Sequence, residues 1–573
     1  MSKNPGTALF LKKRFQRSQL LILLVLFGSI GITACSPDDN PGQNSSGSEL
    51  VQAIAENERR RPRNTPLPQN NNPDFNGTNR PGTADQGNLP PNGNNNGFTA
   101  NGNLDSSLRN LIRINNLNAN PERGRNLPSI SSPLSQLGMQ LFYSKSLGGG
   151  MDTACASCHH PSLGGGDDLA LSIGVDAQNP DLLGLGRSLA SDGPLVGRNA
   201  PTVFNSGLWD RGMFWDSRVE SLGGEARRNG TASGISTPDS GFGAADLNAG
   251  SNLPAAQALF PVTAAAEMRS EDFEKGSSNE EIRRHLAARI GDYGEGSGEL
   301  DPNLWLQSFQ SAFDSRADAE SLITFRNIAA AIAEFERSMV FVRNPWHAYV
   351  AGDNQALSDD AKRGAILFFS PPQNGGAGCS RCHRGPNLSD GLHHSIGFPQ
   401  IGPGSGDGQT GDEDYGRERV TGNPGDRYRF RTASLLNVEM TAPFTHSGAY
   451  RTLEQVIAHY NNPEQSVNAY FRNGAWCAIP QFELIEDCER LYPNALQNSR
   501  KSLSKLQNDR RNGQSLLPRI NLNRNEISDL AAFLRSLTDP CLKNRTCLSP
   551  WIPDDRSPDG NQLNAVNADG VFL

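Results

Sequence analysis

A five-residue pattern of two cysteines and one histidine occurs twice in this chain of 573 residues, as Cys155-Ala156-Ser157-Cys158-His159 and as Cys379-Ser380-Arg381-Cys382-His383. In a C-x-x-C-H sequence, the two thiols can bond to the vinyl groups of a porphyrin, and the adjoining imidazole is placed to bind the iron. The pattern predicts two covalently attached c-type haems. Cysteine and histidine also form tetrahedral zinc sites, but the 224 residues between the motifs disfavour that alternative.

Four of the remaining cysteines form two close pairs in the sequence, Cys477 with Cys488 and Cys541 with Cys547. In an oxidising compartment, cysteines this close together form local disulfides. We therefore predict two disulfides that staple surface loops.

The N-terminal segment has the organisation of an export signal. Four basic residues between Lys12 and Arg17 precede an apolar run, Leu20 to Ile32, which is shorter than the roughly 20 residues of a bilayer-spanning helix. The run ends in Ile32-Thr33-Ala34-Cys35, which resembles the lipobox of bacterial lipoproteins. This resemblance implies a lipid on Cys35 and, with Ser36 next, a periplasm-facing or cell-surface lipoprotein of the outer membrane. An ordinary signal peptide with a chance cysteine is the alternative.

The composition separates a tether from a folded part. Residues 36–103 contain 16 Asn, 9 Pro and 8 Gly, which predicts a disordered, flexible tether after the signal segment 1–35. The net charge is −8, and removal of residues 1–35, which carry five basic and no acidic residues, leaves −13. This charge excludes a nucleic-acid partner.

After the tether, apolar residues recur at helical spacing, and alternating strand patterns are nearly absent. We expect a mostly α fold with helices around Leu108–Ile112 and Leu134–Phe142, and over Glu280–Tyr293, Leu322–Val340, Leu453–Tyr460 and Glu526–Leu537. The Gly-, Ala- and Asn-rich stretch 223–252 is expected to be a surface insertion.

A predicted helix in which a glycine is followed three residues later by Leu-Phe precedes each haem motif. This repeated pattern indicates two cytochrome c-like domains. The chain from about Leu134 to Leu537 resembles the bacterial dihaem cytochrome c peroxidase and MauG family. The matching stretches, in family order, are Gly197–Thr202, Phe214–Asp216, Gln257 with Pro261 and Glu267-Met268, Phe430–Thr432 and Thr441–Gly448. We expect domains at 104–340, with the peroxidatic haem, and at 341–550, with the electron-transfer haem, and a tail at 551–573.

The resemblance implies a peroxide-cleaving site at the first haem. Glu267 matches the family's acid/base glutamate, and a carboxylate above the iron can move a proton from the near to the far oxygen of peroxide. Gln257 and Pro261 match residues that line the distal side, and Trp215 matches the tryptophan that relays electrons between the haems. The bland alternative for Trp215 is a buried core tryptophan.

One departure from the family concerns the distal side of the first haem. In the peroxidases that require reductive activation, a histidine sixteen residues after the proximal histidine blocks the iron, and Val175 stands at that position here. Valine cannot ligate iron. We therefore expect a five-coordinate first haem, as in the MauG branch.

The second haem takes its distal ligand fourteen residues after the histidine of the Thr-x-Pro-x-x-His motif, and the count from His446 gives Tyr460. The MauG branch has tyrosine at this position, whereas the reductively activated peroxidases have methionine. A phenolate ligand lowers the reduction potential relative to a thioether. His459 and Met440 are the alternative ligands.

The family also implies a Ca²⁺ near the inter-haem tryptophan. Its matching oxygens are the Asn199 side chain and the Thr441 and Pro443 carbonyls, and hard oxygen donors suit Ca²⁺. Arg431 matches a partner of a haem propionate, with a surface arginine as its bland alternative.

Together these residues predict an oxidoreductase that uses H₂O₂ to oxidise a donor, with two haems c and one Ca²⁺. Val175 and Tyr460 favour a MauG-like enzyme with a protein side chain as donor. The runner-up is a peroxidase supplied by small c-type cytochromes. A dihaem electron carrier and a dihaem oxygenase are further alternatives.

Overall fold

The computed structural model describes residues 103–118, 120–190, 195–483, 485–554 and 557–573. The signal segment, Cys35 and the tether up to residue 102 lie outside these residues, so the lipid anchor and the tether stay predictions. Within the described part of the chain, no helix has the length and apolarity to cross a membrane.

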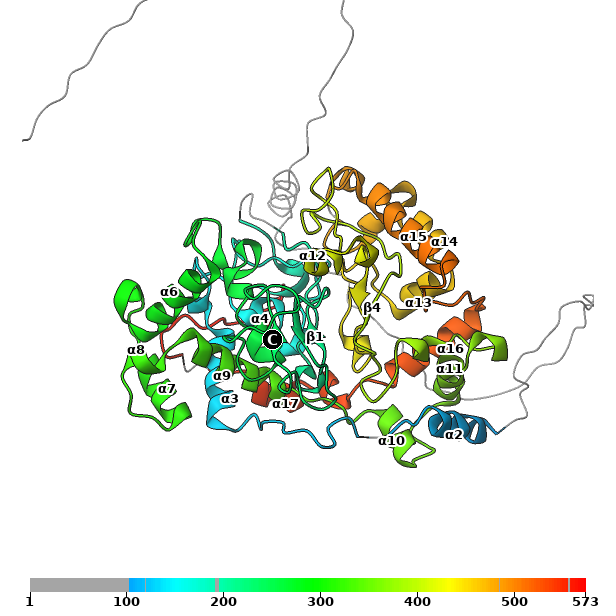
Figure 1. Ribbon diagram of the computed structural model, residues 1–573, viewed down its shortest axis with the longest axis horizontal. Helices are drawn as coiled ribbons and strands as arrows, with labels where there is room; N and C mark the ends of the chain where they lie inside the picture. The colour runs from blue at the N-terminus through cyan, green and yellow to red at the C-terminus, as the bar shows by residue number, and fades with distance from the viewer. Residues whose placement is uncertain (1–102, 119, 191–194, 484, 555–556) are drawn as a thin grey trace, which may run out of the picture. The chain divides into compact units, whose positions relative to one another are not determined.

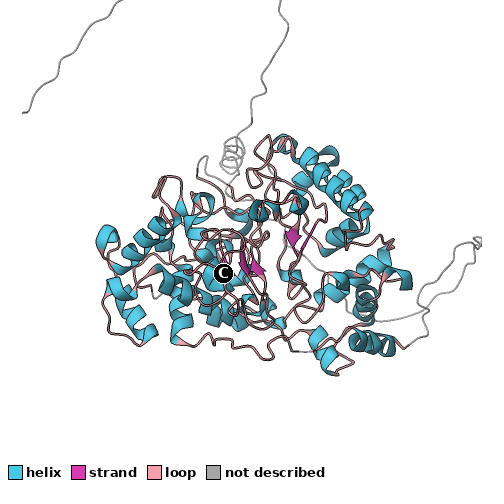
Figure 2. Ribbon diagram, in the orientation of Figure 1, coloured by secondary structure: helices cyan, strands magenta, loops and turns pink. Residues whose placement is uncertain are grey.

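The fold is mostly α, as expected from the sequence, and its strands are only two or three residues long (Figure 2). The α-helices are α2 (Leu104–Ile114), α3 (Pro133–Tyr143), α4 (Cys155–Cys158), α5 (Leu253–Gln257), α6 (Asn279–Gly291), α7 (Trp305–Phe313), α8 (Ala319–Leu322), α9 (Phe325–Ser338), α10 (Pro345–Ala351), α11 (Asp359–Phe369), α12 (Glu418–Thr421), α13 (Leu453–Asn461), α14 (Pro463–Phe471), α15 (Ala495–Arg511), α16 (Arg524–Arg535) and α17 (Arg545–Leu548). The strands are β1 (Gly212–Met213), β2 (Val219–Ser221), β3 (Ile235–Ser236), β4 (His393–His394) and β5 (Phe430–Arg431).

Side-chain caps explain where the long helices begin. The Ser278 hydroxyl accepts a hydrogen bond from the Glu281 N–H at the start of α6, and Glu281 accepts one from the Ser278 N–H. Asn523 and Glu526 form the same reciprocal pair at the start of α16. Each pair satisfies backbone donors that a helix leaves free at its first turn. Helices α6, α9 and α16 begin and end within a few residues of the predicted limits.

The described chain has two lobes, one around the core that contains the first haem motif and one around the core that contains the second. Each lobe is built on a pair of helices that cross at a glycine. Helix α3 packs on α9 in the first lobe, and α11 packs on α16 in the second (Figure 1). A Cβ on Gly138 would lie 1.9 Å from the Ala331 carbonyl oxygen, and one on Gly364 would lie 1.9 Å from that of Asp529. The two lobes therefore share one packing geometry immediately before their haem motifs.

Alanine at Gly138 or Gly364 is expected to destabilise the protein by about 1–3 kcal/mol, because the added methyl group overpacks a backbone contact. Denaturant unfolding of the haem-loaded protein measures this loss. Gly425→Ala is the control, since its Cβ would meet only the Asn423 side chain, 3.1 Å away. Equal unfolding midpoints for all three variants would contradict the close-crossing interpretation.

The packing of the two ends of the described chain differs from the sequence-based division. Helix α2, expected in the first domain, packs in the second core beside Trp346, and the Tyr349 hydroxyl donates to Asp105 at 2.7 Å. The C-terminal tail packs on the first core instead, where the Trp305 indole donates to Asp559 at 2.7 Å. Each end of the described chain therefore buries its apolar residues in the core formed by the other half of the chain.

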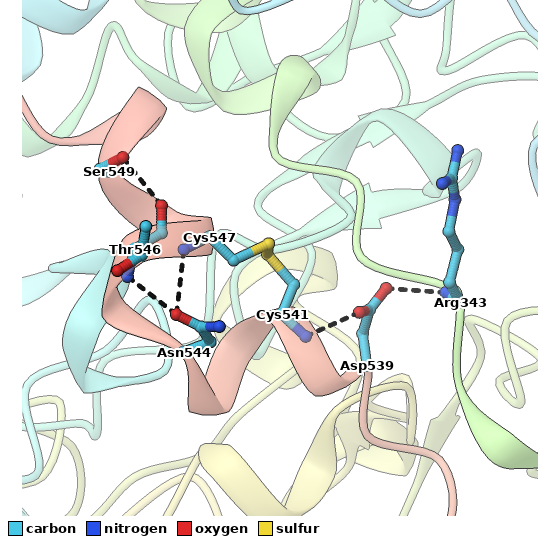
Figure 3. Close-up of a disulfide and its surroundings, with 7 residues drawn as sticks. All are labelled: Arg343, Asp539, Cys541, Asn544, Thr546, Cys547 and Ser549. Atoms are coloured by element: carbon cyan, nitrogen blue, oxygen red, sulfur yellow. Dashed lines mark hydrogen bonds between the residues drawn. A yellow bond between two sulfur atoms is a disulfide. The ribbon is translucent and has the colours of Figure 1, made fainter.

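Both predicted disulfides are present, Cys477–Cys488 and Cys541–Cys547. Figure 3 shows the second one, where Asp539 accepts a hydrogen bond from the Cys541 N–H and Asn544 accepts one from the Cys547 N–H. Short turns on either side therefore fix the backbone at this bridge.

The stretch 223–252 is more than a surface insertion. Leu247 is 88% exposed and Phe242 is 53% exposed, as expected of a surface segment. However, strand β3 within it pairs antiparallel with β2, and the buried Asn229 amide donates to the Trp209 carbonyl at 2.6 Å. The segment is therefore tied to the first lobe along one side.

Candidate functional site

The two motif histidines have the same orientation. Nδ1 of His159 donates to the Gly165 carbonyl at 3.2 Å, and Nδ1 of His383 donates to the Leu388 carbonyl at 3.0 Å. A carbonyl can only accept, so the proton is on Nδ1 and the Nε2 lone pair is free for a metal. Burial lowers the pKa of His159 to about 4 and lowers that of His383, which keeps both imidazoles neutral, as metal ligands must be. This arrangement fits a haem at each motif.

An apolar cavity lies at the second motif. Its lining includes Cys379, Cys382, His383, Phe368, Tyr460 and Trp215. The four motif cysteines form no disulfide in this structure, which leaves their thiols available for attachment. A large apolar wall with a free imidazole and two thiols fits a covalently held porphyrin.

The structure separates the three candidate ligands for that cavity. Tyr460 lines it, and its hydroxyl has no hydrogen-bond partner among the described residues. Both ring nitrogens of His459 are engaged elsewhere, since Nδ1 accepts from the Tyr450 hydroxyl at 3.0 Å and Nε2 donates to the Ile396 carbonyl at 3.1 Å. Met440 packs against the core of the first lobe. This geometry favours Tyr460.

Glu267 lies close to the first motif although 109 residues separate it from Cys158. It belongs to a single π-helical turn, Ala265–Arg269, and its charge raises the pKa of the buried Cys158 thiol beyond the effect of burial. A Cβ on Gly174 would lie 2.2 Å from the Glu267 carbonyl oxygen. The turn that carries Glu267 is therefore pressed against the segment that follows the first motif.

The side chain of Glu267 is 29% exposed, and Arg218 lies 3.8 Å from it. Burial raises the pKa of the Glu267 carboxyl, and the Arg218 charge opposes that rise. A carboxyl with a raised pKa can hold a proton closer to neutral pH, as a general acid/base must.

The other residues predicted for the distal side lie on segments near Glu267. Val175 follows Gly174 and is fully buried, and its side chain offers no imidazole to an iron. Gln257 ends α5 and Pro261 begins the next helical turn, Pro261–Thr263, on the approach to Glu267.

Trp215 lies where the two lobes meet. Its indole donates to the Asn199 carbonyl at 2.9 Å, and its carbonyl accepts from the Arg431 N–H at 2.8 Å. Residues 199–202 line the cavity at the second motif, called the second cavity below. The Pro201 backbone also contacts His159 of the first motif. Trp215 therefore connects the cavity of the second motif with the segment that contacts the first.

Comparison with known proteins agrees with this geometry. Residues 132–355 match the family model of the di-haem cytochrome c peroxidases. Over these residues the chain is similar to the di-haem cytochrome c peroxidase and MauG family. The chain is 27% identical over 335 residues to cytochrome c551 peroxidase of Pseudomonas aeruginosa. This match covers 58% of the present chain and 73% of that protein. It is 29% identical over 324 residues to the methylamine utilization protein MauG of Methylorubrum extorquens, covering 56% and 67%.

Two solved structures are also similar to this chain. A MauG-like protein associated with microbial copper homeostasis is 22% identical, with a TM-score of 0.47 and coverage of 75% of this chain and 97% of that one. The diheme peroxidase BthA from Burkholderia thailandensis is 19% identical, with a TM-score of 0.45 and coverage of 77% and 92%.

The match, these relatives and the two C-x-x-C-H motifs together indicate a peroxidase-type oxidoreductase with two c-type haems. The three residues matched to a calcium ion, Asn199, Thr441 and Pro443, all line the cavity at the second motif. The Asn199 amide nitrogen donates to the Leu169 carbonyl at 2.8 Å, which turns its oxygen the other way. Arg431 is buried, with its guanidinium over the Trp209 ring at 4.7 Å, which differs from a surface arginine.

Two arginines near these residues have no identifying pattern in the sequence. Arg218 contacts both Glu267 and the face of Phe214, and no motif spacing identifies it. Arg198, within the motif Gly197–Thr202, bridges Asp216 and Asp414 at 2.6 Å each and so joins the two lobes.

Proposed function

We propose that the protein is a MauG-like enzyme that uses hydrogen peroxide at its first haem without reductive activation and oxidises a protein side chain. Val175 carries the proposal, because it leaves no imidazole in the segment that lies against Glu267. A peroxidase supplied by small c-type cytochromes is the second candidate, favoured by the similarity to cytochrome c551 peroxidase. The lipobox-like sequence at Cys35 supports an outer-membrane lipoprotein as the cellular form.

Each of the site residues has a separate role in this proposal. When bound, the haems supply an open iron position at the first motif and a one-electron store at the second. Glu267 moves the peroxide proton from the near to the far oxygen, and Arg218 orients the carboxylate. Trp215 offers an oxidisable indole between the lobes, Tyr460 would ligate the second iron, and Arg431 would pair with a haem propionate, since all three line the cavity at the second motif. Asn199, Thr441 and Pro443 would hold one Ca²⁺ through oxygen. Two electrons from the donor and two protons reduce one H₂O₂ to two waters.

The deciding experiment mixes the diferric protein with one equivalent of H₂O₂ in a stopped-flow spectrometer. The Soret band is expected to shift or bleach within the mixing time, because no ligand has to leave the first iron. The control is the half-reduced protein under the same conditions. An inert diferric form with a fast half-reduced form would replace this proposal by the second candidate.

Tyr460→Phe is expected to convert a low-spin EPR signal of the ferric second haem into a high-spin one, because phenylalanine has no ligand atom. Tyr415→Phe, in a tyrosine that packs against Tyr428 at 5.9 Å between ring centroids, is the matched control and is expected to leave the spectrum unchanged. A low-spin signal that survives in Tyr460→Phe would assign the ligand to His459 or Met440.

A further inference from the structure

A tyrosine and a histidine form a buried hydrogen-bonded pair behind the second cavity. The Tyr450 hydroxyl lies 3.0 Å from Nδ1 of His459, and both residues are buried, with 4% and 0% of their surface exposed. The Ile396 carbonyl lies 3.1 Å from Nε2 of His459 and can only accept a hydrogen bond. Nε2 therefore carries the proton, and Nδ1 is the acceptor of the Tyr450 O–H.

This pair lies beside the wall of the second cavity. The His459 and Tyr460 rings are neighbours at 6.5 Å between centroids. The Phe398 ring packs against both of them, with its centroid 4.5 Å from that of His459 and 5.7 Å from that of Tyr460. Tyr460 itself lines the cavity of the second motif. Aromatic rings in contact therefore lead from that cavity to the Tyr450 phenol.

Other tyrosines follow in the same core but differ in one respect. Tyr470 packs edge-on against Tyr450 at 5.6 Å, and the buried hydroxyls of Tyr470 and Tyr492 have no hydrogen-bond partner in the described structure. A phenol that loses an electron becomes a far stronger acid, so it ends as a neutral radical only where a base beside it takes the proton. Among these three tyrosines, only Tyr450 has a base in place to take the proton.

We infer that Tyr450 is a redox-active tyrosine that receives an oxidising equivalent from the second haem. The inference rests on the proposed function, in which H₂O₂ supplies the oxidant. One electron passes from Tyr450 to the oxidised haem centre, the Tyr450 O–H bond breaks, and the proton moves to Nδ1 of His459. The products are a neutral tyrosyl radical, an imidazolium and a haem centre reduced by one electron. The site holds an oxidising equivalent away from the iron until a donor returns the electron.

The test is EPR of the haem-loaded protein, frozen after reaction with H₂O₂ and grown with ring-deuterated tyrosine to identify the radical. Wild type is expected to give a tyrosyl signal, and Tyr450→Phe is expected to lose it. His459→Gln is expected to lose it as well, because an amide oxygen accepts the hydrogen bond but cannot take the proton. Tyr470→Phe is the matched control, since its hydroxyl makes no hydrogen bond, and it is expected to keep the signal.

A second arm separates this inference from the proposed function. A flash-generated ruthenium(III) polypyridyl complex replaces peroxide and oxidises the haems directly. A radical in this arm with no Soret response to peroxide would reject the proposed function and retain the redox tyrosine. Oxidised haems with no Tyr450-dependent radical, or a signal that disappears in Tyr470→Phe, would overturn the inference. Unchanged Soret and circular dichroism spectra establish that each variant is folded.

Discussion

Replacement of Glu267 by glutamine is expected to slow the reaction of the diferric protein with H₂O₂ by about 10²–10⁴-fold, the usual contribution of a general acid/base. Glutamine keeps the size and polarity of the side chain but cannot exchange a proton. The turn Ala265–Arg269 is fixed by its backbone, with the Gly149 N–H donating to the Met268 carbonyl at 2.8 Å, so the loss reflects chemistry rather than misfolding. Stopped-flow measurement of the Soret band gives the rate constant.

Glu271→Gln is the matched control for this variant. Glu271 lies four residues further along, has a side chain that is 67% exposed and, among the described residues, forms an ion pair only with Lys275. It is expected to react at the wild-type rate. A Glu267→Gln protein that reacts as fast as Glu271→Gln would mean that another group moves the proton.

The pair Cys155→Ala and Cys158→Ala is expected to remove one covalent haem from the protein, and the pair Cys379→Ala and Cys382→Ala is expected to remove the other. Thioether bonds need the thiols, whereas each histidine stays in place. The denatured mass and the pyridine haemochrome ratio measure the number of haems for each protein molecule. Two haems are expected for wild type and one for either variant.

A double replacement of Cys477 and Cys488 by alanine controls for the loss of cysteine as such. These two cysteines form a disulfide, so this variant is expected to keep both haems. Haem that acid acetone extracts from the wild-type protein, or a wild-type mass with a single haem, would reject covalent attachment at two motifs.

Much of the chemistry was predictable because it is encoded locally. Each C-x-x-C-H motif places its ligands within five residues, and the disulfides close loops of 11 and 6 residues. Helix positions followed from apolar spacing and from caps such as Asn523 with Glu526. Assignment of Glu267 needed the family resemblance, since the surrounding sequence has no distinctive pattern of its own.

The sequence by itself determined two haem attachment sites, two disulfides, a mostly α fold and the absence of a histidine at position 175, because each depends on residue type and short spacing. Only the tertiary structure decided which residues far apart in the chain meet. In the folded chain, Gly174 lies against the Glu267 backbone and Arg218 lies beside the Glu267 carboxylate. Both ring nitrogens of His459 form hydrogen bonds, and α2 packs on the second core. These contacts depend on how closely backbones approach and on which polar atoms find partners on burial, and neither is written in local spacing.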